Sequence, residues 1–393
     1  MKSKTDKVYF PNLNGLRAIG AFIVLIGHIE FIKQFWKIPY YQWFPIPGKV
    51  GVSLFFALSG FLITSLLLQE MKSTNTIKLK NFYIRRILRI WPLYYIIVVL
   101  SIFVFNQLGF LKIPGFSDNV LNNLSLTNIL ILLLLLPNFT HYYIPYADQR
   151  WSIIVEEQFY LFQPLLIRLL KRRNYLLIAF TVVIFSPEII KFVVNILDFG
   201  NSISSNIVSA LLTQLKYLAC IAVGCAFSIL FFRKENLCKR ILFRKDVQWL
   251  VMIILFTAIG LGHYILFTEE VLDYRIYTLL CAVMVLNAAQ NPASILKLEN
   301  SILNFLGSIS YGLYMYHPVC IGAGIFIATR ITSNLIIQNI LIYSLSVTLT
   351  ILISWLSFKY VESFFLKIKS RMEIVKTKKK VVHAALAAPT PVN

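Results

Sequence analysis

The stretch LTNILILLLLLPNF, residues 126–139, decides how this chain crosses a membrane. A helix needs about 20 consecutive apolar residues to span the hydrocarbon core of a bilayer. Here Pro137 interrupts the apolar run well before that length. The stretch therefore either crosses as a short helix or enters the membrane and returns, and the two choices place every later loop on opposite sides.

Apolar segments surround this stretch along nearly the whole chain, which is 58% hydrophobic and has a mean hydropathy of +0.72. Soluble domains are only about half apolar. Long continuous runs indicate helices, because the strands of a membrane β-barrel give short alternating segments. The other predicted spans are 13–32, 50–69, 87–108, 151–170, 174–197, 209–232, 248–267, 272–290, 302–327 and 335–358.

Basic loops distinguish the two choices, because Lys and Arg accumulate on the cytoplasmic side of membrane proteins. If 126–139 spanned, the clusters KRRN (171–174), FRKENLCKR (232–240) and VKTKKK (375–380) would all face outward. If it returns, all three face the cytoplasm. We therefore predict an all-α, polytopic protein of the inner cell membrane, with about ten transmembrane helices and one re-entrant or interfacial segment. Both termini are expected in the cytoplasm.

The end of the chain differs in composition from the rest. We predict a transmembrane domain over residues 1–370 and a basic, disordered cytoplasmic tail over 371–393. Between the last apolar segment and this tail, KYVESFFLKIKSRM (359–372) is amphipathic and basic, which suits the inner membrane surface. The net charge of +21 is interpreted as a topology signal, and no nucleic acid partner is expected.

Two polar residues share one face of the first apolar segment, GLRAIGAFIVLIGH (15–28). Arg17 and His28 are separated by about 16 Å of helix and by about three turns. Each has an ordinary explanation: a snorkelling arginine at the inner surface and a histidine hydrogen-bonded between helices. Their common face favours a shared functional role.

Arg86 and Arg89 also share a helix face, in FYIRRILRIWPLYY (82–95), at the expected cytoplasmic end. Paired guanidinium groups suit phosphate, which arginine binds in bidentate fashion. The alternative is that they only fix the topology. Between these two segments lies a face of small residues, which favours close helix packing over a passage for a slim ligand. Its members are Gly48, Gly51, Ser53, Ser59 and Gly60.

The acidic pair in WSIIVEEQFY (151–160) lies between two apolar segments, where carboxylates are costly. Ser152, Glu156 and Tyr160 share one helix face, and Glu157 points about 100° away. A carboxylate beside a histidine could orient the ring and raise its basicity. The alternative is a solvated pair near a helix start, where the helix dipole favours acids.

A break is expected within GSISYGLYMYHP (307–318), where glycine, tyrosines and His317-Pro318 interrupt the tenth apolar segment. Tyr311, Tyr314 and Tyr316 favour a pocket wall, with interfacial anchoring as the alternative.

The ordered set of GLRAIGAFIVLIGH, GVSLFFALSGFLIT, FYIRRILRIWPLYY, WSIIVEEQFYLFQP and SISYGLYMYHP resembles the membrane-bound acyltransferase 3 family over roughly residues 8 to 365. The resemblance implies ten transmembrane helices and transfer of acyl groups, often acetyl, from cytoplasmic acyl-CoA. The implied acceptors are hydroxyls of extracytoplasmic carbohydrates, such as cell-surface polysaccharides. Some members carry a fused SGNH-type hydrolase domain; we expect none here, which favours direct transfer or a separate extracytoplasmic partner protein.

The resemblance and the residue patterns together give a set of site predictions. His28, Glu156 and Glu157 are expected to be catalytic, with His28 as general base or transient acyl carrier. Arg17, Arg86 and Arg89 are expected to bind acetyl-CoA, and Trp151, Ser152, Tyr311 and His317 the acceptor. No metal is expected. Alternatives are a small-molecule acceptor or, in another class, a transporter or flippase, which would explain intramembrane charges such as Glu188 and Lys191.

Overall fold

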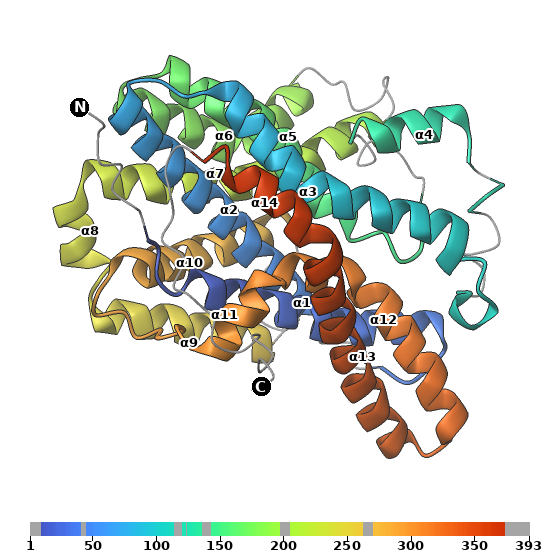
Figure 1. Cartoon of the computed structure of the whole chain (residues 1–393). Coiled ribbons are helices and arrows are strands. Elements are labelled where there is room, and N and C mark those ends of the chain that lie inside the picture. Colours follow the sequence, from blue (N-terminus) through green and yellow to red (C-terminus); the bar gives the residue numbers. More distant parts are fainter. Residues whose placement is uncertain are drawn as a thin grey trace, which may run out of the picture.

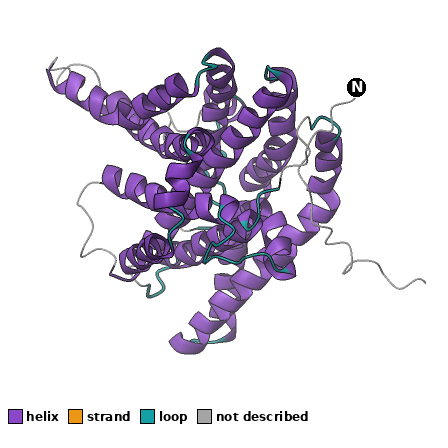
Figure 2. Cartoon of the chain, turned by 90° about the vertical axis from the view of Figure 1, so that its left-hand side faces the viewer, coloured by secondary structure: helices purple, strands orange, loops and turns teal. Residues whose placement is uncertain are grey.

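The computed structural model describes residues 9–40, 45–113, 120–122, 124–135, 143–196, 205–261 and 270–373. These residues form helices joined by loops, with no strand in the described part (Figures 1 and 2). Residues 374–393, which make up most of the predicted tail, lie outside the described ranges. So does Pro137.

The helices follow the predicted apolar segments closely. They are α1 (Leu13–Phe35), α2 (Pro45–Thr74), α3 (Leu79–Leu100), α4 (Leu126–Leu133), α5 (Arg150–Leu169), α6 (Arg173–Ile196), α7 (Ser205–Arg233), α8 (Glu235–Ile241), α9 (Lys245–Leu261), α10 (Glu270–Gln290), α11 (Ser301–Ser308), α12 (Ser310–Ile331), α13 (Leu335–Ser357) and α14 (Ser363–Ser370). Short π-helical turns follow α3 at Ser101–Phe105 and α13 at Phe358–Glu362. The short helix α8 lies within the basic FRKENLCKR loop and had not been predicted.

Seven helices of the described residues are long and apolar enough to cross a membrane. They are Leu13–Phe35, Gly48–Thr74, Leu79–Phe105, Arg173–Val194, Val208–Arg233, Ser310–Ile331 and Leu335–Ser370. The protein is therefore an all-α, multi-pass membrane protein. The remaining predicted spans correspond to α5, α9 and α10; α5 carries Glu156 and Glu157 and so is less apolar. The count of ten and the cytoplasmic termini stay predictions.

The described part of the segment 126–139 is too short to span. Helix α4 has 8 residues, or about 12 Å of helix at 1.5 Å per residue. It is tied to α3, because the hydroxyls of Tyr94 and Tyr95 donate to the carbonyl oxygens of Leu132 and Leu133 at 3.4 and 2.9 Å.

Helix α2 is central to the bundle, since it packs against α1, α5, α7 and α10. Its small residues allow the close approach. A Cβ atom added at Gly51 would lie 2.6 Å from Cγ2 of Val24 on α1, and one added at Gly60 would overlap the carbonyl oxygen of Ile221 on α7. The close-packing interpretation is therefore confirmed at both glycines. Because they face different neighbours, they do not line a single passage.

The tenth apolar segment is divided into two helices. The predicted break lies at Ile309, between α11 and α12. Helix α12 then continues without interruption through His317 and Pro318, so these two residues do not themselves break it.

The last helices form one long rod. The run Leu335–Ser370 has 36 residues, or about 54 Å of helix, which exceeds the roughly 40–45 Å thickness of a bilayer with its headgroups. Its final part, α14, lies against α3 rather than apart from the bundle (Figure 1).

Candidate active site

Two histidine rings meet where α1 and α12 pack together. The centroids of His28 and His317 are 4.8 Å apart, with an interplanar angle of 69°. Nδ1 of His28 lies 2.9 Å from the carbonyl oxygen of Val24, and Nδ1 of His317 lies 2.7 Å from that of Tyr314. A carbonyl oxygen only accepts hydrogen bonds, so each Nδ1 carries a proton and each neutral ring keeps its lone pair on Nε2.

The two rings differ in access. His317 is 0% exposed, and its Nε2 has no hydrogen-bond partner among the described residues. His28 is only half-buried. A reagent therefore meets His28 first, with His317 behind it. A Cβ atom added at Gly48 would have the His28 ring as its sole described neighbour within 4 Å, at 3.9 Å, so the described residues do not pack tightly between Gly48 and this ring.

Ser152 is linked to the histidine pair through Tyr314. The hydroxyl oxygens of Ser152 and Tyr314 are 2.6 Å apart, and the Tyr314 hydroxyl donates to the carbonyl oxygen of Gln149 at 3.1 Å. The backbone carbonyl of the same tyrosine holds His317. The start of α5 and the imidazoles therefore form one buried polar network.

The two glutamates lie elsewhere. The Tyr160 hydroxyl donates to Oε2 of Glu156 at 3.1 Å, which confirms their predicted common face. Nε1 of Trp91 donates to Oε2 of Glu157 at 2.9 Å. No contact in the described structure joins either glutamate to His28, whose ring is oriented by the Val24 carbonyl instead. Among the described acids, Asp148, in the loop before α5, is the one whose charge acts on that ring.

The predicted arginines come together at the opposite end of α1. Arg17 lies close enough to Arg86 and Arg89 for their charges to interact, and Glu156 lies within the same range. The Arg86 guanidinium sits 5.2 Å from the centroid of the Tyr160 ring. Its Nε has no hydrogen-bond partner in the described part of the chain. Glu156 therefore interacts with the arginine end of the site, and its charge also acts on Tyr314.

The two predicted aromatic residues of the acceptor site are held by other contacts. Trp151 is half-buried, and its ring stacks at a tilt on Tyr217, with centroids 4.5 Å apart. The Tyr311 hydroxyl donates to the carbonyl oxygen of Ile90 at 2.8 Å and so fastens α12 to the arginine-bearing helix α3.

Several polar residues of this region had no assigned role in the sequence analysis. Tyr314 was interpreted only as a pocket wall, and Trp91 lies two residues after Arg89 without a charge to mark it. Glu362 and Lys369 lie in a segment whose amphipathic pattern indicates a surface helix. Only Asp148 could have been found from the sequence. It lies three residues before Trp151 and adds a third acid to Glu156 and Glu157 near the start of α5.

Within the described residues, no group of three or more His, Cys, Asp or Glu side chains is placed to hold a metal ion. Metal-free chemistry stays a prediction.

Comparison of the sequence with known proteins identifies the family of this chain. Residues 10–359 match the model of the acyltransferase 3 domain, described as "Acyltransferase domain". The chain belongs to the acyltransferase 3 family. This acyltransferase 3 chain is 29% identical to "Putative O-acetyltransferase SACOL0978" of Staphylococcus aureus strain COL, over 91% of its own length and 58% of the relative's.

A second relative of the acyltransferase 3 chain is O-acetyltransferase OatA of Staphylococcus aureus strain NCTC 8325. The identity is 27%, over 90% of this chain and 57% of OatA. The chain thus spans somewhat more than half the length of these relatives. No solved structure matches it.

Proposed function

We propose that this protein is a membrane-bound acyltransferase that moves an acyl group, in the first place acetyl, from cytoplasmic acyl-CoA to a hydroxyl of an extracytoplasmic carbohydrate. One observation carries the proposal. Helix α1 carries Arg17, which joins the arginine cluster, and His28, which joins the imidazole pair. These two residues are about 16 Å apart along the helix axis. Family membership supports the same reaction.

The arginine cluster is suited to the donor's phosphates. Arg86 and Arg89 come from one face of α3, and Arg17 adds a third guanidinium from α1. Arginine stays charged and presents planar donors that match phosphate oxygens in pairs. In this role the cluster binds acyl-CoA at the cytoplasmic mouth, and the pantetheine arm extends along α1 toward His28.

The imidazole pair is suited to the transfer step. Nε2 of His28 removes the proton of the acceptor hydroxyl, and the oxygen attacks the thioester carbonyl. The carbon–sulfur bond breaks, CoA leaves as a thiolate, and the proton on His28 passes to that sulfur. While His28 carries the extra proton, the lone pair on the unpartnered Nε2 of His317 lies beside the His28 ring and stabilises its positive charge.

The other predicted residues have supporting roles in this scheme. Ser152 acts on His317 through Tyr314, whose carbonyl oxygen accepts from the His317 ring. Trp151 presents an aromatic surface near the start of α5 on which a sugar ring stacks. Glu156 balances the arginine charge, and Glu157 holds the Trp91 indole. A separate extracytoplasmic transferase remains part of the proposal as a partner for acceptors that cannot reach the membrane.

The test is acetyl transfer by the purified protein in sealed vesicles. We expect label from acetyl-CoA supplied on the cytoplasmic face to appear in ester linkage on a polysaccharide supplied on the other face. Label on an added small molecule instead would show that the acceptor is a small molecule and not a polysaccharide. Failure of the protein to bind any CoA thioester would contradict the proposal and favour a transporter.

A further inference from the structure

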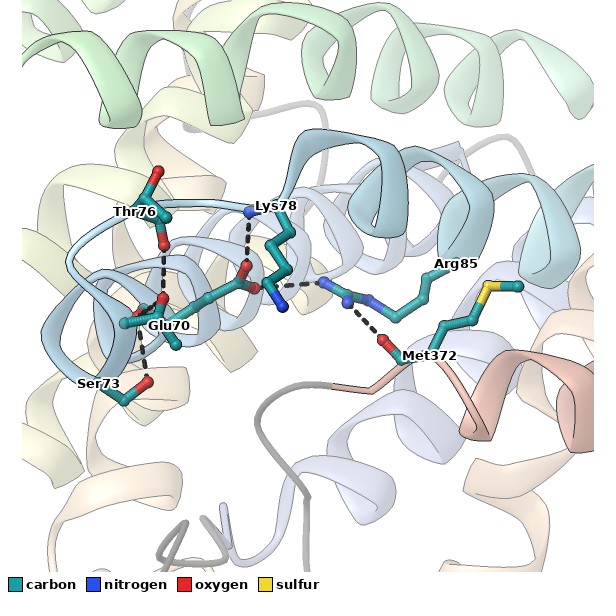
Figure 3. Close-up of polar contacts among 7 residues, drawn as sticks. Glu70, Ser73, Thr76, Lys78, Arg85 and Met372 are labelled. Atoms are coloured by element: carbon teal, nitrogen blue, oxygen red, sulfur yellow. Dashed lines mark hydrogen bonds and ion pairs between the residues drawn. The ribbon is translucent and has the colours of Figure 1, made fainter. Parts of the chain in front are cut away.

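The C-terminal helix α14 lies beyond the region that the family model matches, which ends at residue 359. It is nevertheless fixed against the helix that carries Arg86 and Arg89. Nη1 of Arg85 on α3 donates to the carbonyl oxygen of Met372 at 2.9 Å (Figure 3). The same guanidinium contacts the buried carboxylate of Glu70 at 3.5 Å, and that carboxylate accepts the backbone N–H of Lys78 at 2.8 Å.

This attachment brings two charged residues to the arginine cluster. Lys369 of α14 lies close enough to Arg17, Arg86 and Arg89 for their charges to interact. Glu362, in the π-helical turn before α14, is 5% exposed and faces Arg89. Neither of its carboxylate oxygens has a hydrogen-bond partner in the described structure. Such π-helical turns occur frequently at functional sites.

The four cations are close together without direct counter-ions. Among the described residues, Arg17, Arg86, Arg89 and Lys369 make no ion pair within 4.0 Å, whereas their neighbour Arg85 does, with Glu70. The acids of the region, Glu156, Glu157, Glu362 and Glu373, act on them only at longer range. Cations grouped in this way repel one another, and an anion with several oxygens placed among them removes that cost.

We propose that α14 completes the donor site and that Lys369 binds a nucleotide phosphate of the acyl-CoA. This inference rests on the proposed function, because it names a further residue of the same donor site. Lys369 adds a charge from α14 to those of the arginines on α3 and α1. Glu362 attracts Arg89 only at longer range, so the guanidinium stays available to the phosphate.

Lys369→Gln tests the proposal, with Lys367→Gln as the matched control. Lys367 is exposed, lies on the same helix and points about 200° away, and its substitution removes the same charge. Both variants are assayed in nanodiscs of phosphatidylcholine, with acetyl-CoA and with S-acetylpantetheine, which lacks all nucleotide phosphates. We expect Lys369→Gln to raise the KM for acetyl-CoA about tenfold and to leave transfer from S-acetylpantetheine unchanged. The control stays within about twofold of wild type for both donors.

Three results would overturn the inference, and they are distinguishable. Equal KM values for the two variants would exclude Lys369 from the donor site. An equal loss with both donors would show that Lys369 only supports the structure. A defect that appears only when phosphatidylglycerol is added to the nanodiscs would assign Lys369 to a lipid headgroup. If the wild type transfers acetyl from neither donor, the proposed function itself fails.

Discussion

At the scale of residues, the account depends on which atoms of His28 and His317 are available for chemistry. Both Nδ1 atoms are engaged by backbone carbonyls at 2.9 and 2.7 Å, which leaves Nε2 as the reactive nitrogen on each ring. The sequence pointed to both residues through their motifs. It could not show that they touch, because His317 lies in a helix distant in the chain and the contact depends on how α1 and α12 pack.

His317→Asn tests the role of the second ring. The asparagine amide can keep a donor to the Tyr314 carbonyl while it removes the lone pair of Nε2. We expect about a tenfold loss in the rate of acetyl transfer, the effect of losing one hydrogen bond next to a charged group. The affinity for acetyl-CoA, measured by isothermal titration, should stay unchanged. A wild-type transfer rate in this variant would mean that His317 is an ordinary core residue.

At the scale of elements, the small residues of α2 determine how the helices approach one another. Periodicity and composition were enough to predict that α1, α2, α3 and α13 exist, and α1 and α13 almost to their ends, since these helices are long and apolar. The predicted starts of α2 and α3 fall five and eight residues after the observed ones. The short helix α8 was not predicted, and neither was the exact position of the break within 307–318, at Ile309. They depend on local contacts in polar or mixed stretches, where apolar periodicity carries little information.

Gly60→Ala tests the packing of α2 on α7, with Gly260→Ala as control. A Cβ atom at Gly60 would overlap the backbone of Ile221, whereas one at Gly260, on an exposed face of α9, meets no described residue within 4 Å. We expect Gly60→Ala to lower the thermal unfolding temperature by several degrees, through about 1–3 kcal/mol of overpacking. Gly260→Ala should leave it unchanged or raise it, because alanine favours helix over glycine. Equal unfolding temperatures would contradict the predicted close contact.

At the scale of the whole molecule, the proposal requires the arginine cluster and the imidazole pair to face opposite sides of the membrane. The sequence predicted this polarity from its basic loops, and family membership was likewise predictable from the ordered motifs. The contribution of α14 was not, because an amphipathic basic helix has the same pattern whether it lies on lipid or against α3. Likewise, Glu156 shares a motif with Trp151 and Ser152, but its charge also acts on Arg17, because it lies one turn further along α5 than Ser152.

Cysteine labelling tests the orientation. The loops after α2 and after α12 are expected on opposite sides, so Lys72→Cys reports the inner face and Ser333→Cys the outer face; both positions are exposed. The native cysteines provide little background, because all five are buried. A membrane-impermeant maleimide applied to intact cells should label Ser333→Cys, and should label Lys72→Cys only after permeabilisation. The reverse pattern would invert the topology.

The most direct test of the central claim separates donor binding from transfer in two variants. For His28→Ala, we predict unchanged affinity for acetyl-CoA and a loss of about 10²–10⁴-fold in kcat, since only the general base is removed. For Arg86→Ala, we predict a raised KM for acetyl-CoA with much of kcat retained. Wild-type turnover by His28→Ala, or an unchanged KM in Arg86→Ala, would contradict a donor held by the arginines and a transfer step performed at the imidazole.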